Sequence, residues 1–195
     1  MLDVFIIEGP RGNAIRRDIE SVALHWWKSI IKDDPDYLNF RFIEMNEDED
    51  PLDFAIRARQ YAFTCSGSDV FILTDNDMLP FSMEDIKAGV DVITEYESFF
   101  QLSAMPKPHT IKLIRLDRYR QINNDHIMEH YSSGGLRFCH KVPELQAPLE
   151  KVKGYDGVFC RHLYDKHGMK CGYLKGSNAF HLGAHCSTLW DKTKN

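Results

Sequence analysis

The chain has 195 residues, of which 43% are hydrophobic and 27% are charged, so it is long enough for one domain with a substantial core. Its net charge of -5 argues against a nucleic-acid-binding protein, because phosphate contacts of that kind need a clustered excess of Lys and Arg. No apolar run approaches the length of a membrane span, and five cysteines without a CxxC pair favour reduced thiols in a cytoplasmic protein.

The first predicted elements are a strand over residues 3–8 and a helix that follows a tight turn. The turn has the sequence GPRGN, and its last residue, Asn13, is a typical helix cap. Apolar residues then recur at helical spacing from Ile15 to Ile30, and the DDP sequence at 33–35 ends the helix.

The same alternation continues through the third strand. Residues 38–44 predict a strand, the acid-rich residues 46–50 predict a solvated loop, residues 51–65 predict a helix, and residues 69–74 predict another strand. The order β-α-β-α-β indicates a parallel sheet with helices on its faces. Ligands of such sheets collect at the carboxyl ends of the strands, so we expect the site at that edge.

The second half is less regular. Ser82 followed by Asp85 resembles a capping box at the start of a helix. Residues 117–153 have no clear period and are left unassigned. The further elements predicted are a helix at 82–96, strands at 99–105 and 110–116, a helix at 157–168 and a final strand at 169–174.

Two aspartates, Asp75 and Asp77, stand directly behind the third apolar strand. Side chains at i and i+2 of a strand point the same way, so the two carboxylates are expected to converge just beyond the strand end. Carboxylates that close repel each other unless a cation lies between them. Mg²⁺ and Mn²⁺ typically use one or two carboxylates and complete their shell with substrate phosphate oxygens. The alternative is an ordinary turn rich in Asx residues.

In these residues the chain resembles the nucleotide-sugar-dependent glycosyltransferases of the GT-A fold. The similarity runs through RARQYAFTCSGSDVFILTDNDMLP at 57–80 and GYDGVFCRHLYDKHGMKCGYLKGSNAFHLG at 154–183. It implies a Rossmann-like three-layer α/β/α fold with a mostly parallel central sheet. It also implies a single domain over 1–195, with a nucleotide-binding half up to about residue 105 and an acceptor half from about 106. The compact length resembles small virus-encoded domains of this family, which work in the host cytoplasm.

The resemblance implies a metal site that holds Mn²⁺ or Mg²⁺. Asp77 would coordinate the metal, and Asp75 would meet the donor ribose or reach the metal through water. His181 would be the third protein contact to the metal or the diphosphate. His185 competes for that role, and a zinc site using His181, His185 and Cys186 is the alternative, although the absence of CxxC disfavours structural zinc.

The resemblance also places the donor nucleotide. The end of the first strand and the Asn within the DxD motif would contact it, and Arg57 is preferred over Arg59 as the arginine that faces it. A plain turn and a solvated helix face are the alternatives for these two segments. The expected nucleotide contacts are Glu8, Gly9, Pro10, Arg11, Arg57, Asp75 and Asn76.

By resemblance, the expected activity is inverting transfer of a sugar from a nucleoside diphosphate, with UDP-glucose or UDP-rhamnose as examples, to a glycan or glycoprotein acceptor. Inversion needs a carboxylate general base opposite the leaving group, and Asp156 is the candidate. The family often shows Glu-Asp there, whereas this chain has Tyr155 and Asp156, and a simple N-cap aspartate is the alternative. The small-residue sequence SSGG at 132–135 would belong to an acceptor-side loop.

Two other functions fit parts of the pattern. Haloacid-dehalogenase-type phosphatases also carry DxD after four apolar residues, with the first Asp as nucleophile. They usually place it on the first strand, whereas here it follows the third and precedes Pro80. A non-catalytic module that binds nucleotide sugars is the second alternative, because it needs the DxD but no working base.

Overall fold

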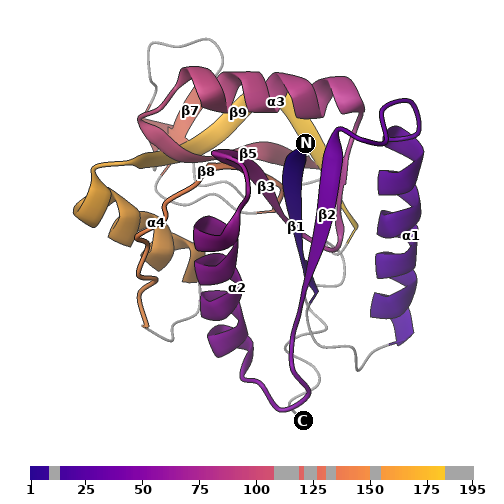
Figure 1. The fold of residues 1–195 in the computed structure, drawn as a ribbon, viewed down its shortest axis with the longest axis horizontal. Coiled ribbons are helices and arrows are strands. Elements are labelled where there is room, and N and C mark those ends of the chain that lie inside the picture. Colours follow the sequence, from indigo (N-terminus) through magenta and orange to yellow (C-terminus); the bar gives the residue numbers. More distant parts are fainter. Residues whose placement is uncertain (9–13, 108–118, 121–126, 131–134, 150–154, 183–195) are drawn as a thin grey trace.

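The computed structural model describes residues 1–8, 14–107, 119–120, 127–130, 135–149 and 155–182 (Figure 1). Within these ranges the chain forms four helices and nine strands. The helices are α1 (Ala14–Ile30), α2 (Pro51–Cys65), α3 (Met83–Glu95) and α4 (Tyr155–His167). The strands are β1 (Leu2–Glu8), β2 (Leu38–Glu44), β3 (Val70–Asp75), β4 (Met78–Pro80), β5 (Phe99–Lys107), β6 (Tyr119–Arg120), β7 (Ile127–His130), β8 (Arg137–His140) and β9 (Lys170–His181).

All described strands belong to one sheet with the order β2-β1-β3-β8-β5-β9-β7-β6, and β4 pairs with β9 off this path. β1 is parallel to β2 and β3, and β5 is parallel to β9. β8 is antiparallel to both β3 and β5, so five of the six central strands run in one direction. The expected mostly parallel sheet is confirmed, with β8 as the strand that runs against it.

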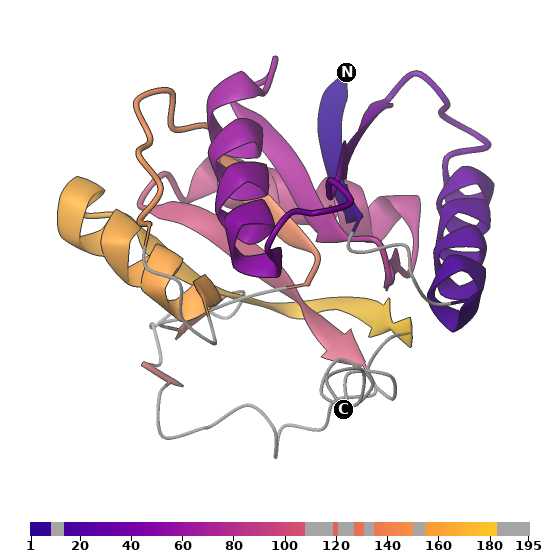
Figure 2. The same ribbon diagram turned by 90° about the horizontal axis from the view of Figure 1, so that it is seen from below.

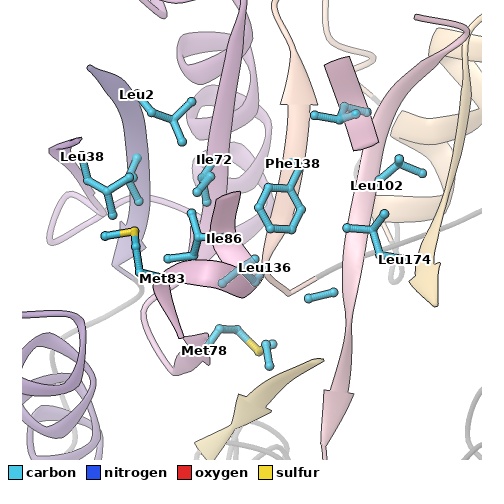
Figure 3. Close-up of a cluster of buried hydrophobic side chains, with 14 of the residues drawn as sticks. Leu2, Leu38, Ile72, Met78, Met83, Ile86, Leu102, Leu136, Phe138 and Leu174 are labelled. Carbon is cyan, nitrogen blue, oxygen red and sulfur yellow. The ribbon is translucent and has the colours of Figure 1, made fainter. Parts of the chain in front are cut away.

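The helices cover both faces of this sheet. One face packs against α1 and α3, and its buried cluster includes Trp27 and Ile86 (Figures 1 and 3). The other face packs against α2 and α4, with Phe63 and Phe159 in its cluster (Figure 2). The clusters alternate along the strands because successive strand residues point to opposite faces; Ile72 belongs to the first cluster and its neighbours to the second. The three-layer α/β/α architecture is therefore confirmed.

Local residues determine where α2 and α3 begin and where α4 ends. The acid-rich loop at 46–50 ends in Asp50, whose side chain accepts hydrogen bonds from the backbone N–H groups of Leu52 and Asp53. Ser82 caps α3 by accepting from the N–H of Asp85, as the capping box predicts. Gly168 has a φ of +66° directly after α4, a conformation that glycine adopts at little cost.

The sheet differs from the sequence prediction in the length of its final strand and in its short strands. The final strand runs to His181 instead of ending at Leu174, because β9 continues alongside β5 and then pairs with β4. The short strands β4, β6, β7 and β8 were not predicted, since two to four residues are too few to establish a period. The predicted strand at 110–116 and the Asn13 cap lie outside the described residues. No helix among those described is long and apolar enough to cross a membrane.

Candidate active site

The two aspartates lie at the carboxyl edge of the sheet, as predicted. Asp75 is the last residue of β3, and Asn76 and Asp77 form the turn into β4. The backbone N–H of Asn76 donates to the carbonyl of Ile7 at 3.2 Å, which ties this turn to the end of β1. Asp77 stands in the turn instead of on the strand, so the two carboxylates have different neighbours.

Asp77 faces His181 across the β4–β9 pair. Met78 stands opposite His181 in the strand register, and the N–H of Leu182 donates to the Asp77 carbonyl at 2.9 Å. His181 Nε2 lies 3.2 Å from Asp77 Oδ2. Burial by itself would lower the pKa of His181, but the contact with Asp77 outweighs burial and raises it. The pairing of β4 with β9 brings Asp77 and His181 together although they are far apart in the chain.

The other carboxylate oxygen of Asp77, Oδ1, is buried and has no hydrogen-bond partner among the residues that the structure describes. A buried, unpaired carboxylate oxygen is costly and indicates a missing cation or donor. In the part of the chain that the structure describes, no group of three or more His, Cys, Asp or Glu side chains could hold a metal ion by itself. Asp77 and His181 could serve as two protein ligands of a divalent ion. The remaining ligand oxygens would have to come from another molecule, such as a substrate phosphate.

Asp75 points instead to a buried arginine on β8. Arg137 is only 1% exposed, and its Nη1 lies 3.3 Å from Asp75 Oδ1. Its Nη2 lies 3.5 Å from Asp156 Oδ1, so one guanidinium joins β3 to α4. Within the described ranges, the Nε of Arg137 has no hydrogen-bond partner, and neither does the buried hydroxyl of Ser103, its cross-strand neighbour. Arg137 was not among the residues predicted from the sequence, because β8 is too short to be recognised as a strand.

Asp156 is held by two arginines. It occupies the first turn of α4, which begins at Tyr155, so it is not the residue that precedes the helix. Arg59 Nη2 donates to Asp156 Oδ1, and the Arg59 guanidinium lies over the Tyr155 ring, 5.4 Å from its centroid. Asp75, Arg137, Asp156 and Arg59 therefore form a continuous chain of alternating charges, which we call the charge chain.

The pKa values of the two aspartates in the charge chain are shifted in opposite directions. Protein around the Asp75 carboxylate raises its pKa, which Arg137 opposes and Asp77 and Asp156 reinforce. The same desolvation acts on Asp156, but Arg59 and Arg137 outweigh it and lower its pKa. The pKa of Arg137 is raised despite its burial, because Asp75 and Asp156 favour its charged form.

We call the turn of Asn76 and Asp77, with Asp75 before it, the DxD turn. A pocket of about 440 Å³ opens beside it, between α1 and the carboxyl ends of β1 and β2. Glu8 and Asn76, both predicted nucleotide contacts, line it together with Glu20 of α1. The Nδ2 of Asn76 donates to Glu20 Oε1 at 2.6 Å. No sequence pattern pointed to Glu20, whose position beside Asn76 depends on how α1 packs against the sheet.

The structure does not bring Arg57 to this region. Its guanidinium donates to Glu49 at 2.7 Å and to the Glu44 carbonyl at 2.8 Å, on an exposed face of α2. Arg59, two residues later, is the arginine that joins the charge chain. Several predicted residues lie outside the described ranges, so the structure does not place them: Gly9, Pro10, Arg11, Ser132, Ser133, Gly134, His185 and Cys186.

Comparison with known proteins supports the fold. No protein-family model and no curated protein matches the sequence. The crystal structure of A197 from STIV is similar over 93% of this chain and 85% of that chain, with a TM-score of 0.56 and 16% identity. The galactosyltransferase LgtC, solved with donor and acceptor sugar analogues, is similar over 88% of this chain and 73% of that chain, with a TM-score of 0.50 and 13% identity. At such identities the likeness establishes a GT-A-like fold.

Proposed function

We propose that this protein is a metal-dependent glycosyltransferase that moves a sugar from a nucleoside-diphosphate sugar to a glycan or glycoprotein acceptor. The observation that carries the proposal is the buried Oδ1 of Asp77, which no described residue hydrogen-bonds, next to His181 at the carboxyl edge of a GT-A-like sheet. Mn²⁺ or Mg²⁺ is the expected ion. Uridine diphosphate is the nucleotide that the family resemblance implies.

In the proposed reaction, Asp77 and His181 would hold the ion, and Asp77 belongs to the turn between β3 and β4. A bound divalent ion would act as a Lewis acid that neutralises charge on the departing diphosphate. Asp75, oriented by Arg137, would contact the donor ribose from the neighbouring strand end. The pocket beside Asn76 would hold the nucleoside end, since it adjoins the same turn.

Asp156 is the proposed general base for the acceptor hydroxyl, and its surroundings set a condition on that role. Two arginines lower its pKa, and a carboxylate with a lowered pKa is a weaker base. Its side chain keeps 38% of its surface exposed, which leaves one side accessible to an acceptor. The proposal requires that an acceptor reach Asp156 from that side.

The pairing of Asp156 with both arginines also favours a second candidate, a module that binds nucleotide sugars without transferring them. In that case Asp156 would only anchor Arg59 and Arg137. The phosphatase alternative has less support, because the motif lies on β3, third in chain order, and Asp75 is engaged by Arg137.

The proposed function predicts metal-dependent hydrolysis of a nucleotide sugar even without acceptor. Incubating the protein with UDP-, GDP- and dTDP-sugars, with and without Mn²⁺, and measuring the released nucleoside diphosphate tests it. We expect release from one nucleotide class that stops when the metal is chelated. Metal-dependent nucleotide binding without turnover would favour the binding module, and hydrolysis of a generic phosphate ester instead would favour the phosphatase.

Replacing Asp156 by Asn separates the two roles of that residue. If it is the base, transfer to acceptor should fall by about 10²–10⁴-fold, the usual contribution of a general base, while the Kd for donor nucleotide changes little. The matched control is Asp165→Asn, an exposed aspartate on the same helix. Unchanged transfer in Asp156→Asn would remove this residue from the mechanism.

A further inference from the structure

Two arginines from different elements hold the same oxygen of Asp156. Arg59 Nη2, on α2, donates to Asp156 Oδ1, and Arg137 Nη2, on β8, lies 3.5 Å from that same atom. The second oxygen, Oδ2, makes no hydrogen bond or ion pair with any residue that the structure describes. The side chain of Asp156 is 38% exposed, so Oδ2 is the oxygen that an incoming group can engage.

Arg59 is itself fixed by its own helix and by α4. It is 7% exposed, and its Nη1 donates to the Ala55 carbonyl at 3.0 Å. Its guanidinium lies over the rings of Tyr155 and Phe159, with Cζ 5.4 Å and 5.9 Å from their centroids. A planar guanidinium that is already held in this way loses little freedom when it binds a carboxylate. Arg59 therefore gives Asp156 a rigid anchor.

Arg59 lies on the face of the sheet opposite to the pocket beside the DxD turn. The pocket is lined by Ile6 and Trp27, which belong to the buried cluster under α1 and α3. Phe159, which the Arg59 guanidinium contacts, belongs to the cluster under α2 and α4. The family resemblance expects Arg57 or Arg59 to contact the nucleotide, but Arg57 binds Glu49 and Arg59 binds an acid of α4.

Holding one oxygen of a carboxylate determines where the other oxygen points. A general base must lie within hydrogen-bond reach of the proton that it takes, about 2.6–3.2 Å, so its orientation matters together with its basicity. Catalytic bases are commonly oriented by a third group that binds the side of the base away from the substrate. Asp156 has this arrangement, because Oδ1 is engaged by two guanidinium groups and Oδ2 lies outside those contacts.

We propose that Arg59 and Arg137 are positioning residues, which hold Asp156 by Oδ1 and present Oδ2 to the acceptor hydroxyl. In this step the acceptor oxygen bonds to the anomeric carbon, its proton passes to Oδ2, and the diphosphate leaves with the electrons of the broken bond. The inference rests on the proposed function, because it names the residues that orient the proposed base. It departs from the family resemblance, since Arg59 acts on the acceptor side and makes no contact with the donor nucleotide.

Arg59 is the residue to test, because Arg137 also contacts Asp75 and its loss affects both acids. The assay is hydrolysis of the donor with Mn²⁺, in which water takes the place of the acceptor, and the donor is the one identified among UDP-, GDP- and dTDP-sugars. We expect the single-turnover rate at saturating donor to fall about ten- to hundredfold in Arg59→Gln, since a misplacement of about 1 Å can cost a factor of about 10². Arg59→Lys keeps the charge but not the planar fork, so it should recover part of the rate.

Binding and stability are measured on the same proteins. The Kd for the nucleoside diphosphate with Mn²⁺, measured by calorimetry, should change by less than about twofold, because the lost contact does not involve the donor. Arg57→Gln is the matched control, since Arg57 lies two residues earlier on an exposed face of the same helix. Thermal melting verifies that each variant is folded.

The contact with Asp156 can also be followed without any reaction, by NMR titration of the Asp156 carboxyl carbon in the metal-free protein. Burial raises the pKa of Asp156, but Arg59 and Arg137 outweigh burial and lower it. The pKa should therefore rise in Arg59→Gln and stay near the parent value in Arg57→Gln. The other titratable or charged groups around Asp156 in the described part of the chain are the same in both variants: Arg137 of β8, Asp75 of β3, Cys171 of β9 and Tyr155 of α4.

The outcomes separate the positioning role from the wider function. If the parent protein hydrolyses no nucleotide sugar, the transferase proposal fails and the positioning role fails with it. If the parent is active but Arg59→Gln weakens nucleotide binding and keeps its rate at saturating donor, Arg59 contacts the donor and only the positioning role is overturned. An unchanged rate with unchanged binding, or an unchanged pKa of Asp156, would overturn it as well.

Discussion

Asp77→Asn should reduce metal-dependent hydrolysis of the donor by roughly 10³-fold, because the Lewis-acid contribution of a bound ion amounts to several kcal/mol. The substitution keeps the shape of the side chain but halves its capacity to ligate a cation. It leaves the contact with His181 possible through the remaining oxygen. Initial rates at saturating Mn²⁺ and the Kd for Mn²⁺ with nucleotide present measure the effect.

The stability of Asp77→Asn distinguishes a functional acid from a structural one. Asn at this position removes the buried charge at Oδ1, which has no hydrogen-bond partner among the described residues, and its amide oxygen can keep the contact that Oδ2 makes with His181. We therefore expect the variant to melt at the same temperature as the parent or above it. Asp165→Asn should leave both rate and melting temperature unchanged. A large loss of stability in Asp77→Asn with full activity would contradict the metal site.

Arg137→Met should destabilise the protein by about 3–5 kcal/mol at neutral pH, the usual effect of removing one partner from a buried ion pair. Arg137 is 1% exposed and its guanidinium lies between Asp75 and Asp156. Without it, Asp75 would lose the arginine that it contacts, and Asp156 would keep Arg59. Urea unfolding at pH 7 measures the change. Arg137→Lys retains the charge and should recover part of the loss.

The matched control is Arg57→Met on the exposed face of α2. Its side chain is 42% exposed where it pairs with Glu49, and ion pairs at the surface contribute about 0–1 kcal/mol. A loss of less than about 1 kcal/mol in Arg137→Met would show that the charge chain does not depend on this residue.

The effect of Arg137→Met should also depend on pH in a known direction. Arg59 and Arg137 lower the pKa of Asp156 in the folded protein, so the stability that this pairing adds is present above the unfolded value of about 3.9. It is lost as the pH falls through the lower folded pKa, because the protonated acid no longer attracts the arginines. The stability difference between parent and variant should therefore be largest near neutral pH and shrink below about pH 4.

The regular elements of the first half were predictable because local signals agree with the final packing. Residues 38–44 and 51–65 form β2 and α2 with the predicted bounds, since each has the period and flanking signals of its element. The DxD turn follows β3 at the sheet edge because a parallel sheet puts every βα connection there. Asp75 and Asp77 could thus be placed from sequence, but not their partners.

Local sequence patterns were sufficient to predict the α/β class, five of the six central strands and the position of the paired aspartates. Three contacts depend on how strands and helices pack: His181 faces Asp77, Arg59 instead of Arg57 turns inward, and Arg137 joins Asp75 to Asp156. The paired residues are far apart in the chain: 104 positions separate Asp77 from His181, and 97 separate Arg59 from Asp156. Arg137 lies 62 positions after Asp75 and 19 before Asp156. Period and propensity report how a residue relates to its near neighbours, whereas a buried charge finds its partner through strand pairing and helix packing, which no local pattern encodes.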